Sequence, residues 1–357
     1  MMGKQRIGVL IGDGVGPEIV PETVRAIEAA VGAAAPGAVE LIELPMGLDA
    51  IERFGSMVPD RTVEELRSCR GWIMGPHDSA AYPPEHDGTP NRILRTAFRL
   101  VANIRPVRVH PGVPAVVDAA DLVIVRENTE GFYSDRNLHL GHGELMVTED
   151  VAITLGVFTR SVVRHVVREA FGLAQGRRRK VTVIHKANVL PRSTGMFLEV
   201  AHELAPEFPE VEVDDMLVDA AAAAFVRDPG RFDVIVTENL FGDVLSDLGA
   251  ELCGSLGLSG SLNAGADIAM AQAGHGAAPD IAGRDVANPV GMIVSGAMLL
   301  RWLGVRAGDP RLVEAGRRIE EAVDAVFAGG VRTRDVGGTA GTREFGQAVL
   351  DELARRG

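Results

Sequence analysis

The stretch RIGVLIGDGVGPEIV, residues 6–20, decides the fold class. It begins with an apolar run rich in β-branched residues, which predicts a buried strand at residues 6–11. Alternating glycines follow, and the pattern then predicts a helix with Pro17 at its first position. The glycine spacing is G-x-G-x-G rather than the G-x-G-x-x-G of dinucleotide-binding turns. We therefore favour a tight strand-to-helix turn over the alternative, a phosphate-binding loop.

The same alternation of short buried strands and longer helices recurs along the chain. Further strands are predicted at residues 71–74, 121–126, 180–185 and 232–237. Further helices are predicted at residues 61–69, 155–171, 194–204, 239–256, 289–303 and 311–327. This order predicts an α/β fold with a largely parallel or mixed sheet. Residues 138–153 break the rhythm with alternating apolar positions, which indicates an antiparallel arm.

Composition narrows the class of protein. The 357 residues, at about 150 per domain, indicate two domains. A net charge of −13 disfavours binding to nucleic acid or to an anionic membrane surface, so we expect neither partner. The 2 cysteines rule out a disulfide framework and favour a reducing, cytoplasmic compartment. We identify no targeting signal and no stretch of membrane-spanning length.

A pair of aspartates gives the sharpest chemical signal. Asp243 and Asp247 lie four residues apart directly after the predicted strand at 232–237, so they share one helix face. Like charges at this spacing destabilise a helix unless a cation lies between them. Carboxylate oxygens are ligands that Mg²⁺ or Mn²⁺ prefers. The position after a buried strand favours a metal site over two solvated aspartates.

Other charged residues lie where ligands bind in α/β proteins. Arg95, Arg105 and Arg126 together could hold carboxylates, although each alone could be an ordinary ion-pair arginine. Lys186 and Asp219 each follow an apolar run that resembles a strand. A lysine near a metal and arginines can serve as a general base, and a structural ion pair is the alternative.

Residues 275–283, HGAAPDIAG, form a loop rich in small residues. Such a backbone can approach a flat ligand closely, and an aspartate there can accept hydrogen bonds from ribose hydroxyls. An ordinary surface loop is the alternative.

Taken together, these stretches resemble the β-decarboxylating dehydrogenases: isopropylmalate, isocitrate, homoisocitrate and tartrate dehydrogenases. The resemblance covers essentially the whole chain, from GDGVGPE at 12–18 through RENTEG at 126–131 and residues 239–247 to the loop at 275–283. It implies a two-domain isopropylmalate-dehydrogenase-like fold that is not a Rossmann fold. Residues 1–100 plus 254–357 would form the large cofactor-binding domain. Residues 101–253 would form a small domain with the dimer interface and an arm near 138–153.

The resemblance also implies roles for individual residues. Arg95, Arg105 and Arg126 match the clamp on the substrate carboxylates. Asp243 and Asp247 match metal ligands, to which the partner subunit adds Asp219. Lys186, also from the partner subunit, matches the base that deprotonates the 2-hydroxyl, and Tyr133 matches the acid that protonates the enol. The loop residues that match the adenosine site are His275, Gly276, Ala277, Ala278, Asp280, Ile281 and Asn288.

The implied activity is NAD-dependent oxidative decarboxylation of a hydroxy-di- or tricarboxylate, with Mg²⁺ or Mn²⁺, by a homodimer or a dimer of dimers with shared active sites. Asp280 and Ile281 resemble the NAD type of the loop. Isopropylmalate enzymes carry apolar residues before the first arginine, where this chain has Thr89, Asn91 and Arg92. These polar residues favour an isocitrate- or homoisocitrate-like substrate, since a buried Arg92 would lie unpaired against an isopropyl group. The alternative is that Arg92 points to solvent.

Three alternatives remain from the sequence. The substrate could be 3-isopropylmalate, or it could be tartrate or D-malate. The chain could also be a non-catalytic regulatory subunit, although such subunits lose tyrosine, lysine or aspartate positions that this chain retains.

Overall fold

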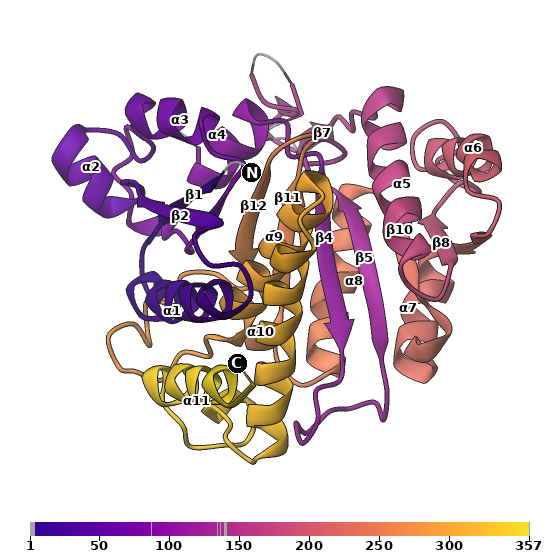
Figure 1. The fold of residues 1–357 in the computed structure, drawn as a ribbon. Helices are drawn as coiled ribbons and strands as arrows, with labels where there is room; N and C mark the ends of the chain where they lie inside the picture. Colours follow the sequence, from indigo (N-terminus) through magenta and orange to yellow (C-terminus); the bar gives the residue numbers. More distant parts are fainter. Residues whose placement is uncertain (1–3, 87, 134, 136, 139–140, 357) are drawn as a thin grey trace. The chain divides into compact units, whose positions relative to one another are not determined.

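The computed structural model describes residues 4–86, 88–133, 135, 137–138 and 141–356 (Figure 1). The chain forms two compact units. Unit 1 comprises Met1–Leu94, His110–Ala115 and Gly254–Gly357, and unit 2 comprises Arg95–Val109 and Val116–Cys253. Both units combine strands with helices, which confirms the predicted α/β class.

The strands of unit 1 follow the order β2-β1-β3-β12-β11. β1 is parallel to β2 and β3, and β12 is parallel to β3 but antiparallel to β11. The strand bounds are β1 Gln5–Leu10, β2 Val39–Glu43, β3 Gly71–Met74, β11 Gly260–Ala264 and β12 Ala269–Ala273.

The helices of unit 1 bury apolar faces against these strands and against one another. α9 packs on β11, β12, α1 and α10, and α1 also packs on α11. The helix bounds are α1 Gly16–Ala34, α2 Leu48–Phe54, α3 Asp60–Arg67, α9 Val290–Ala307, α10 Pro310–Ala328 and α11 Thr342–Arg356. A further helix, α4 Pro90–Ala97, contains the boundary between the two units.

The main strands of unit 2 follow the order β4-β5-β10-β8-β9. β4 is antiparallel to β5, and β5, β10, β8 and β9 are mutually parallel. The strand bounds are β4 Ala102–Arg108, β5 Asp121–Glu127, β8 Lys180–His185, β9 Glu212–Leu217 and β10 Val234–Thr237. The helices are α5 Arg160–Gln175, α6 Gly195–Leu204, α7 Val218–Arg227 and α8 Asn239–Leu252. Because β5, β8, β9 and β10 are parallel, the residues that follow them gather at one edge of the sheet.

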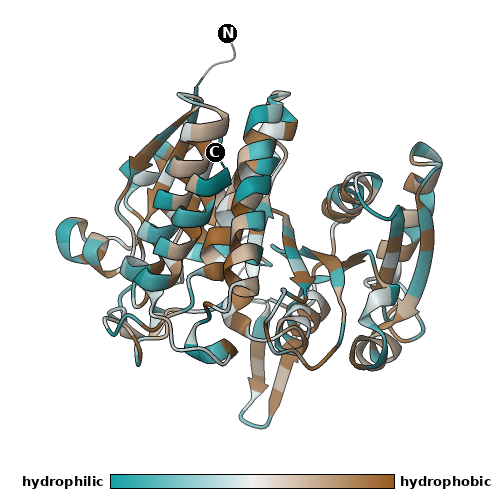
Figure 2. Cartoon of the chain, turned by 60° about the horizontal axis from the view of Figure 1, so that its bottom comes forward, coloured by the Kyte–Doolittle hydropathy of each residue, from teal (hydrophilic) through white to brown (hydrophobic). Residues whose placement is uncertain are grey.

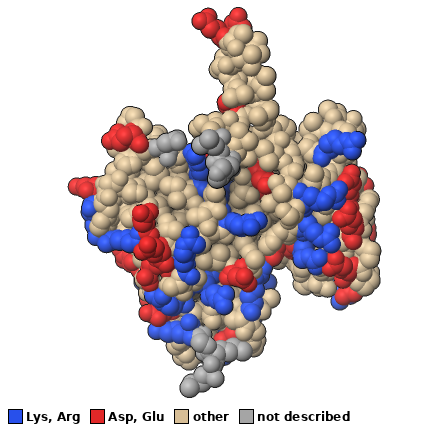
Figure 3. Space-filling model, turned by 90° about the horizontal axis from the view of Figure 1, so that it is seen from above, with Lys and Arg blue, Asp and Glu red and all other residues tan. Residues whose placement is uncertain are grey.

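Unit 2 also carries an antiparallel arm, formed by β6 Glu144–Thr148 and β7 Val151–Thr154. All residues of both strands are exposed, although most are apolar. In Figure 2 the two strands are mostly brown or white and their connecting turn is teal. Figure 3 shows the arm as a projection with few charged side chains on its sides. The predicted arm is thus an antiparallel hairpin, and residues 139 and 140 of its predicted range lie outside the described residues.

Some predicted boundaries are wrong. The helix expected from residue 155 begins only at Arg160, because Val157 forms an antiparallel bridge with Gly131. The helix expected to reach residue 256 ends at Leu252, shortly before Gly254 at φ +140°. Pro17 is the second residue of α1 rather than the first.

The expectation that no segment approaches membrane-spanning length is also wrong. By length and composition α9 could cross a membrane. About 72% of its residues are buried inside the structure, which is the burial of a core helix. Its small residues allow this burial; Gly296 of α9 packs so closely on α1 that a Cβ there would lie 2.8 Å from Cγ2 of Thr23.

Candidate active site

A cluster of charged side chains forms in unit 2 where β5 and β10 end. Arg126 lies near the end of β5 and pairs in register with Thr237 of β10. Arg105 lies on the neighbouring strand β4. After β10 the chain enters α8, which carries Asp243 and Asp247 one turn apart. The strand order therefore brings these four residues, separate in the sequence, into one place.

The start of α8 is fixed by a carboxylate and by a glycine. The side chain of Glu238 accepts hydrogen bonds from the backbone N–H groups of Leu240 and Phe241, so it caps the helix. A Cβ at Gly242 would lie 2.7 Å from the Cβ and Cγ of Arg126. Only glycine lets the helix backbone come this close to Arg126.

Arg126 is almost fully buried, and α8 provides its partners. Its Nε and Nη2 donate to Oδ1 of Asn239 at 2.9 and 2.6 Å, and its Nη1 donates to Oδ1 of Asp243. The Tyr133 hydroxyl donates to Oδ2 of the same aspartate. The guanidinium carbon of Arg126 lies 5.1 Å from the centre of the Tyr133 ring. Asp243 thus joins the tyrosine to the arginine.

Arg105 connects the second aspartate to this cluster. Its Nη1 donates to Oδ1 of Asp247 at 3.0 Å, and its Nη2 lies 3.5 Å from Oδ1 of Asp243. Asn103 and Ser246 accept from Nε and Nη1, which fixes the plane of the guanidinium. Two buried cations therefore neutralise the repulsion expected between the aspartates.

The two aspartates differ in their electrostatics. Burial by itself would raise the pKa of Asp243, but the neighbouring Arg126, the Tyr133 hydroxyl and Arg105 together hold that pKa below its usual value. Burial raises the pKa of Asp247, and the charge of Asp243 adds to this rise against the opposing effect of Arg105. Burial and the charge of Arg126 lower the pKa of Arg105.

Lys186 and Asp219 form a separate pair in unit 2. Lys186 directly follows β8, and Asp219 lies in the first turn of α7 directly after β9. β8 and β9 are parallel, with His185 in register with Leu217, so Lys186, the first residue after β8, lies near Asp219, the second residue after β9. The Lys186 Nζ donates to Asp219 Oδ1, and this hydrogen bond lowers the pKa of Asp219.

Within the described ranges, no three His, Cys, Asp or Glu side chains lie close enough together to hold a metal ion. The chain thus contains two clusters of charged side chains. One is the aspartate pair with Arg105 and Arg126, and the other is the Lys186–Asp219 pair.

The remaining predicted substrate residues lie at α4. Thr89 Oγ1 accepts from the backbone N–H of Arg92 at 3.1 Å and so caps the start of this helix. The Oδ1 atom of Asn91 is buried and has no hydrogen-bond partner among the residues that the structure describes. Arg92 and the buried Arg95 follow one turn apart.

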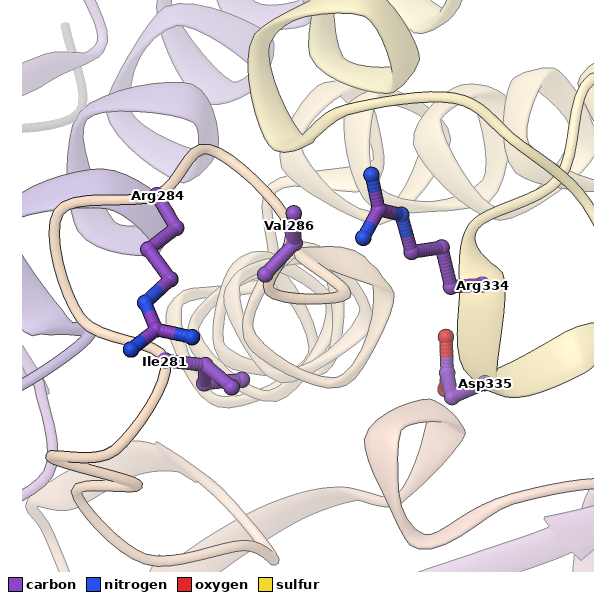
Figure 4. A pocket seen from close by; sticks show the side chains of 5 residues that line it. All are labelled: Ile281, Arg284, Val286, Arg334 and Asp335. Atoms are coloured by element: carbon purple, nitrogen blue, oxygen red, sulfur yellow. The ribbon is translucent and has the colours of Figure 1, made fainter.

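The predicted adenosine loop lies in unit 1, beside a pocket of about 490 Å³. Figure 4 shows its lining residues, and each belongs either to the loop region or to the segment just before α11. They are Ile281, Arg284, Val286, Arg334 and Asp335. Asn288 Nδ2 donates to Asp335 Oδ2 at 3.0 Å, which joins the two segments. Of the predicted loop residues only Ile281 lines this pocket, and Asp280 is exposed.

His275 opens the loop with one nitrogen unsatisfied. Its Nδ1 lies 3.0 Å from the carbonyl oxygen of Gly276, so Nδ1 carries the proton and Nε2 is an acceptor. Burial lowers the pKa of His275, which keeps the ring neutral. Nε2 is buried and has no partner within the described part of the chain.

Comparison with known proteins agrees with this geometry. Residues 6–349 match the family model described as isocitrate/isopropylmalate dehydrogenase. The isocitrate/homoisocitrate dehydrogenase of Thermus thermophilus is 42% identical, over 98% of each chain. The 3-isopropylmalate dehydrogenase of Archaeoglobus fulgidus is 37% identical, over 98% of this chain and 99% of its own. A crystal structure of isocitrate dehydrogenase from Methylococcus capsulatus aligns with a TM-score of 0.85 and 39% identity, over 98% and 99% of the chains.

The chain belongs to the isocitrate/isopropylmalate dehydrogenase family. The resemblance and the fold class predicted from the sequence are therefore confirmed. This family member is an oxidoreductase, a decarboxylating dehydrogenase. The family uses a nicotinamide dinucleotide and a divalent metal ion, and its members act on hydroxy acids.

The residues of this dehydrogenase fit both a divalent metal ion and a nicotinamide dinucleotide. Asp243 and Asp247 offer hard oxygen donors, and the nearby arginines compensate their charge. The unsatisfied Nε2 of His275 suits a donor on a ligand, and the pocket combines apolar Ile281 and Val286 with two guanidinium groups, which suits a nucleotide.

Sequence reasoning missed several neighbours of these residues. Asn239 was part of the quoted motif but received no role, although an amide side chain two residues after a predicted strand was a usable signal. Asn103 and Ser246 become partners of Arg105 only through strand pairing and helix packing. Arg284, Val286, Arg334 and Asp335 carry no local signal, since they form the pocket wall only after folding.

Proposed function

We propose that this dehydrogenase oxidatively decarboxylates a 3-substituted malate with NAD and Mg²⁺ or Mn²⁺, with an isocitrate- or homoisocitrate-like acid as substrate. The observation that carries the proposal is the cluster of Arg105, Arg126, Tyr133, Asp243 and Asp247. It combines cations for carboxylates, oxygen donors for a metal and a phenol that can donate a proton. The 42% identity to the Thermus protein named isocitrate/homoisocitrate dehydrogenase supports the choice of substrate class.

In this mechanism, Arg95, Arg105 and Arg126 bind the substrate carboxylates and fix one geometry, which accounts for much of the rate gain. Lys186 of the partner subunit takes the proton from the 2-hydroxyl, with Asp219 as its neighbour. Asp243 and Asp247, with Asp219 of the partner subunit, would hold the cation. When bound, the cation would supply a Lewis acid for the substrate oxygens, and the nicotinamide would supply the acceptor for the hydride of C2. After the β-carboxylate leaves as CO₂, Tyr133 returns a proton to C3 of the enol.

The cofactor role belongs to unit 1 in this proposal, with the loop at 275–288 and its pocket as the adenosine site. His275 accepts a hydrogen bond through Nε2, and Asp280 accepts from the ribose hydroxyls. The small residues of the loop let the nucleotide approach its backbone closely; they are Gly276, Ala277 and Ala278. Rates with NAD and NADP, compared at equal concentration, test this choice. A higher kcat/KM with NADP would overturn it.

Substrate preference is tested with a panel of 3-substituted malates that carry isopropyl, carboxymethyl, carboxyethyl, hydroxyl or hydrogen at C3. Each assay follows NADH and CO₂ together. We expect the carboxylated acids to have the highest kcat/KM, with equal yields of NADH and CO₂. A preference for the isopropyl compound, or NADH without CO₂, would favour the alternatives. The absence of any turnover would indicate a regulatory subunit.

A homodimer with shared active sites, in the cytoplasm, completes the proposal. The arm supports it, because Leu145, Met146, Val147, Val151 and Ile153 are 44–66% exposed and suit burial against a second copy. Leu240 and Val244 on α8 are two further exposed apolar residues.

Subunit mixing tests the shared site. A Lys186→Ala chain mixed with an Asp243→Ala chain should recover one intact site per heterodimer. The matched control mixes Lys186→Ala with Asp219→Ala chains, which place both defects on the same side of the interface and should recover no activity. Equal recovery in both mixtures, or none in the first after verified subunit exchange, would contradict the shared site.

A further inference from the structure

The glycine turn that precedes α1 contacts the loop at 275–288. The backbone N–H of Val15 donates to the carbonyl oxygen of Ala277 at 2.9 Å. A Cβ on Gly14 would lie 2.0 Å from that same oxygen, and Gly14 has φ +56°. A glycine is therefore required for this close approach. The turn holds the first part of the loop through backbone alone.

Glu18, in the first turn of α1, holds the middle of the loop. Its Oε2 accepts from the backbone N–H of Gly283 at 2.8 Å. Its Oε1 accepts from the backbone N–H of Asp285 at 2.7 Å. Both carboxylate oxygens are thus used on two amides of one loop, and hydrogen bonds to a charged acceptor are among the stronger ones in proteins. Such bidentate contact fixes the direction of the backbone between the two amides.

The loop backbone carries strain close to these contacts. Ala278 has φ +42° and Asp285 has φ +55°, which is the left-handed region that residues with a Cβ rarely adopt. Conformations of this kind persist only where surrounding contacts determine them. Among the contacts here are that of Val15 beside Ala278 and that of Glu18 at Asp285. Without Glu18, the amides of Gly283 and Asp285 would lose their acceptor, and the contacts of Asp285 with the start of α11 would remain.

The far end of the loop has its own anchor. Thr342, the first residue of α11, donates through its hydroxyl to the carbonyl oxygen of Ala287 at 2.6 Å. Its backbone N–H donates to the carbonyl oxygen of Asp285 at 3.2 Å. These contacts do not depend on Glu18, so loss of the glutamate should loosen the middle of the loop without unfolding the unit.

The segment that Glu18 holds forms one wall of the pocket. Arg284 lies between the two amides, and Ile281 and Val286 flank them. We infer that Glu18 is a positioning residue for the nucleotide, which holds the pocket wall in its binding geometry before the nucleotide arrives. This inference rests on the proposed cofactor role of the loop. The GDGVGPE motif then serves nucleotide binding indirectly, by bracing the loop rather than by contacting phosphate.

The size of the effect follows from the population of the braced loop. The apparent Kd equals the intrinsic Kd divided by the fraction of molecules with the competent loop. If removal of Glu18 reduces this fraction to about one tenth, the apparent Kd for NAD rises about tenfold. The chemical step uses residues of unit 2, so kcat at saturating NAD should stay within about twofold of the original value.

The test uses the full chain with Glu18→Ala, and Glu28→Ala as matched control. Glu28 is an exposed glutamate on the same helix, ten residues after Glu18. A third variant, Glu18→Gln, keeps one acceptor oxygen and should show a smaller effect. Hydrogen–deuterium exchange at the amides of Gly283 and Asp285 is measured without cofactor. The Kd for NAD is measured by calorimetry, and KM for NAD and kcat by NADH formation.

We expect faster exchange at both amides and a weaker Kd in Glu18→Ala, with Glu28→Ala unchanged. Unchanged exchange and unchanged Kd in Glu18→Ala would overturn the inference. So would faster exchange with an unaltered Kd, since the brace would then not serve the nucleotide. Absence of NAD binding by the original protein would instead contradict the proposed function. If Glu18→Ala does not fold, Glu18→Gln decides by the same criteria.

Discussion

Replacing Gly242 with alanine should damage the active site far more than it damages the fold. In a helix, alanine is favoured over glycine by about 1 kcal/mol. The new Cβ would lie 2.7 Å from the Cβ of Arg126, and the carbon atoms must separate to about 3.5 Å. Overpacking of this kind costs about 1–3 kcal/mol, so the net loss of unfolding free energy should be about 0–2 kcal/mol.

The required shift separates Arg126 from the α8 residues that it binds. A displacement approaching 1 Å in a catalytic constellation lowers the rate by about 100-fold. We therefore expect kcat/KM for the preferred acid to fall about 30- to 100-fold in Gly242→Ala. The assay is NADH formation at saturating NAD and metal, with unfolding free energy from denaturant titration of the same samples.

Gly172→Ala is the matched control. Gly172 lies in helix α5, and an added Cβ would meet nothing within 4 Å. This variant should be unchanged or more stable by up to about 1 kcal/mol, with the original kcat/KM. Original activity in Gly242→Ala, or an equal loss in Gly172→Ala, would refute the argument that close packing of α8 on Arg126 maintains the site.

Three further predictions concern specificity, pH and salt. Arg92→Leu should raise KM selectively for carboxylated substrates in the malate panel; an unchanged profile would remove Arg92 from substrate recognition. The folded-state pKa of His275 lies below its ordinary 6.5, so its contribution to stability and its free Nε2 lone pair are present above that pH and are lost as pH falls through the folded pKa. NAD affinity should accordingly fall as pH is lowered below 6.5 in the original protein but not in His275→Gln, as calorimetry across pH can show. Arg164→Ala should cost less than about 1 kcal/mol of unfolding free energy at low salt and nothing at high salt, because its pairs with Glu203 and Glu207 are exposed; a salt-independent loss would indicate a packing role instead.

The fold was predictable where sequence pattern and burial agree. The strands β5, β8 and β10 are rich in β-branched residues, and these strands, like β1 and β3, are buried over most of their length, which is the pattern of parallel strands. β11 and β12 were missed, because GSLNA and AMAQA contain small residues and no β-branched ones. They form strands because close packing under α9 requires small side chains. β4 was missed because it contains Pro106, which cannot donate a hydrogen bond to a neighbouring strand.

The candidate site was predictable where one element carries the spacing. Asp243 and Asp247 follow directly from helical periodicity. The contact between Lys186 and Asp219 depends on the register of β8 with β9, and that register is not encoded in local sequence. The pocket wall formed by Arg334 and Asp335 depends on how distant segments pack, so no local pattern could predict it.

The central claim is that the Asp243–Asp247 pair holds a divalent cation on which oxidation of the substrate depends. The most direct measurement is the rate of NADH formation from the preferred acid after exhaustive chelation, and again after Mg²⁺ or Mn²⁺ is restored. We predict that chelation abolishes turnover and that either ion restores it in the original protein but not in an Asp243→Asn variant. Undiminished turnover by the metal-free protein would contradict the account.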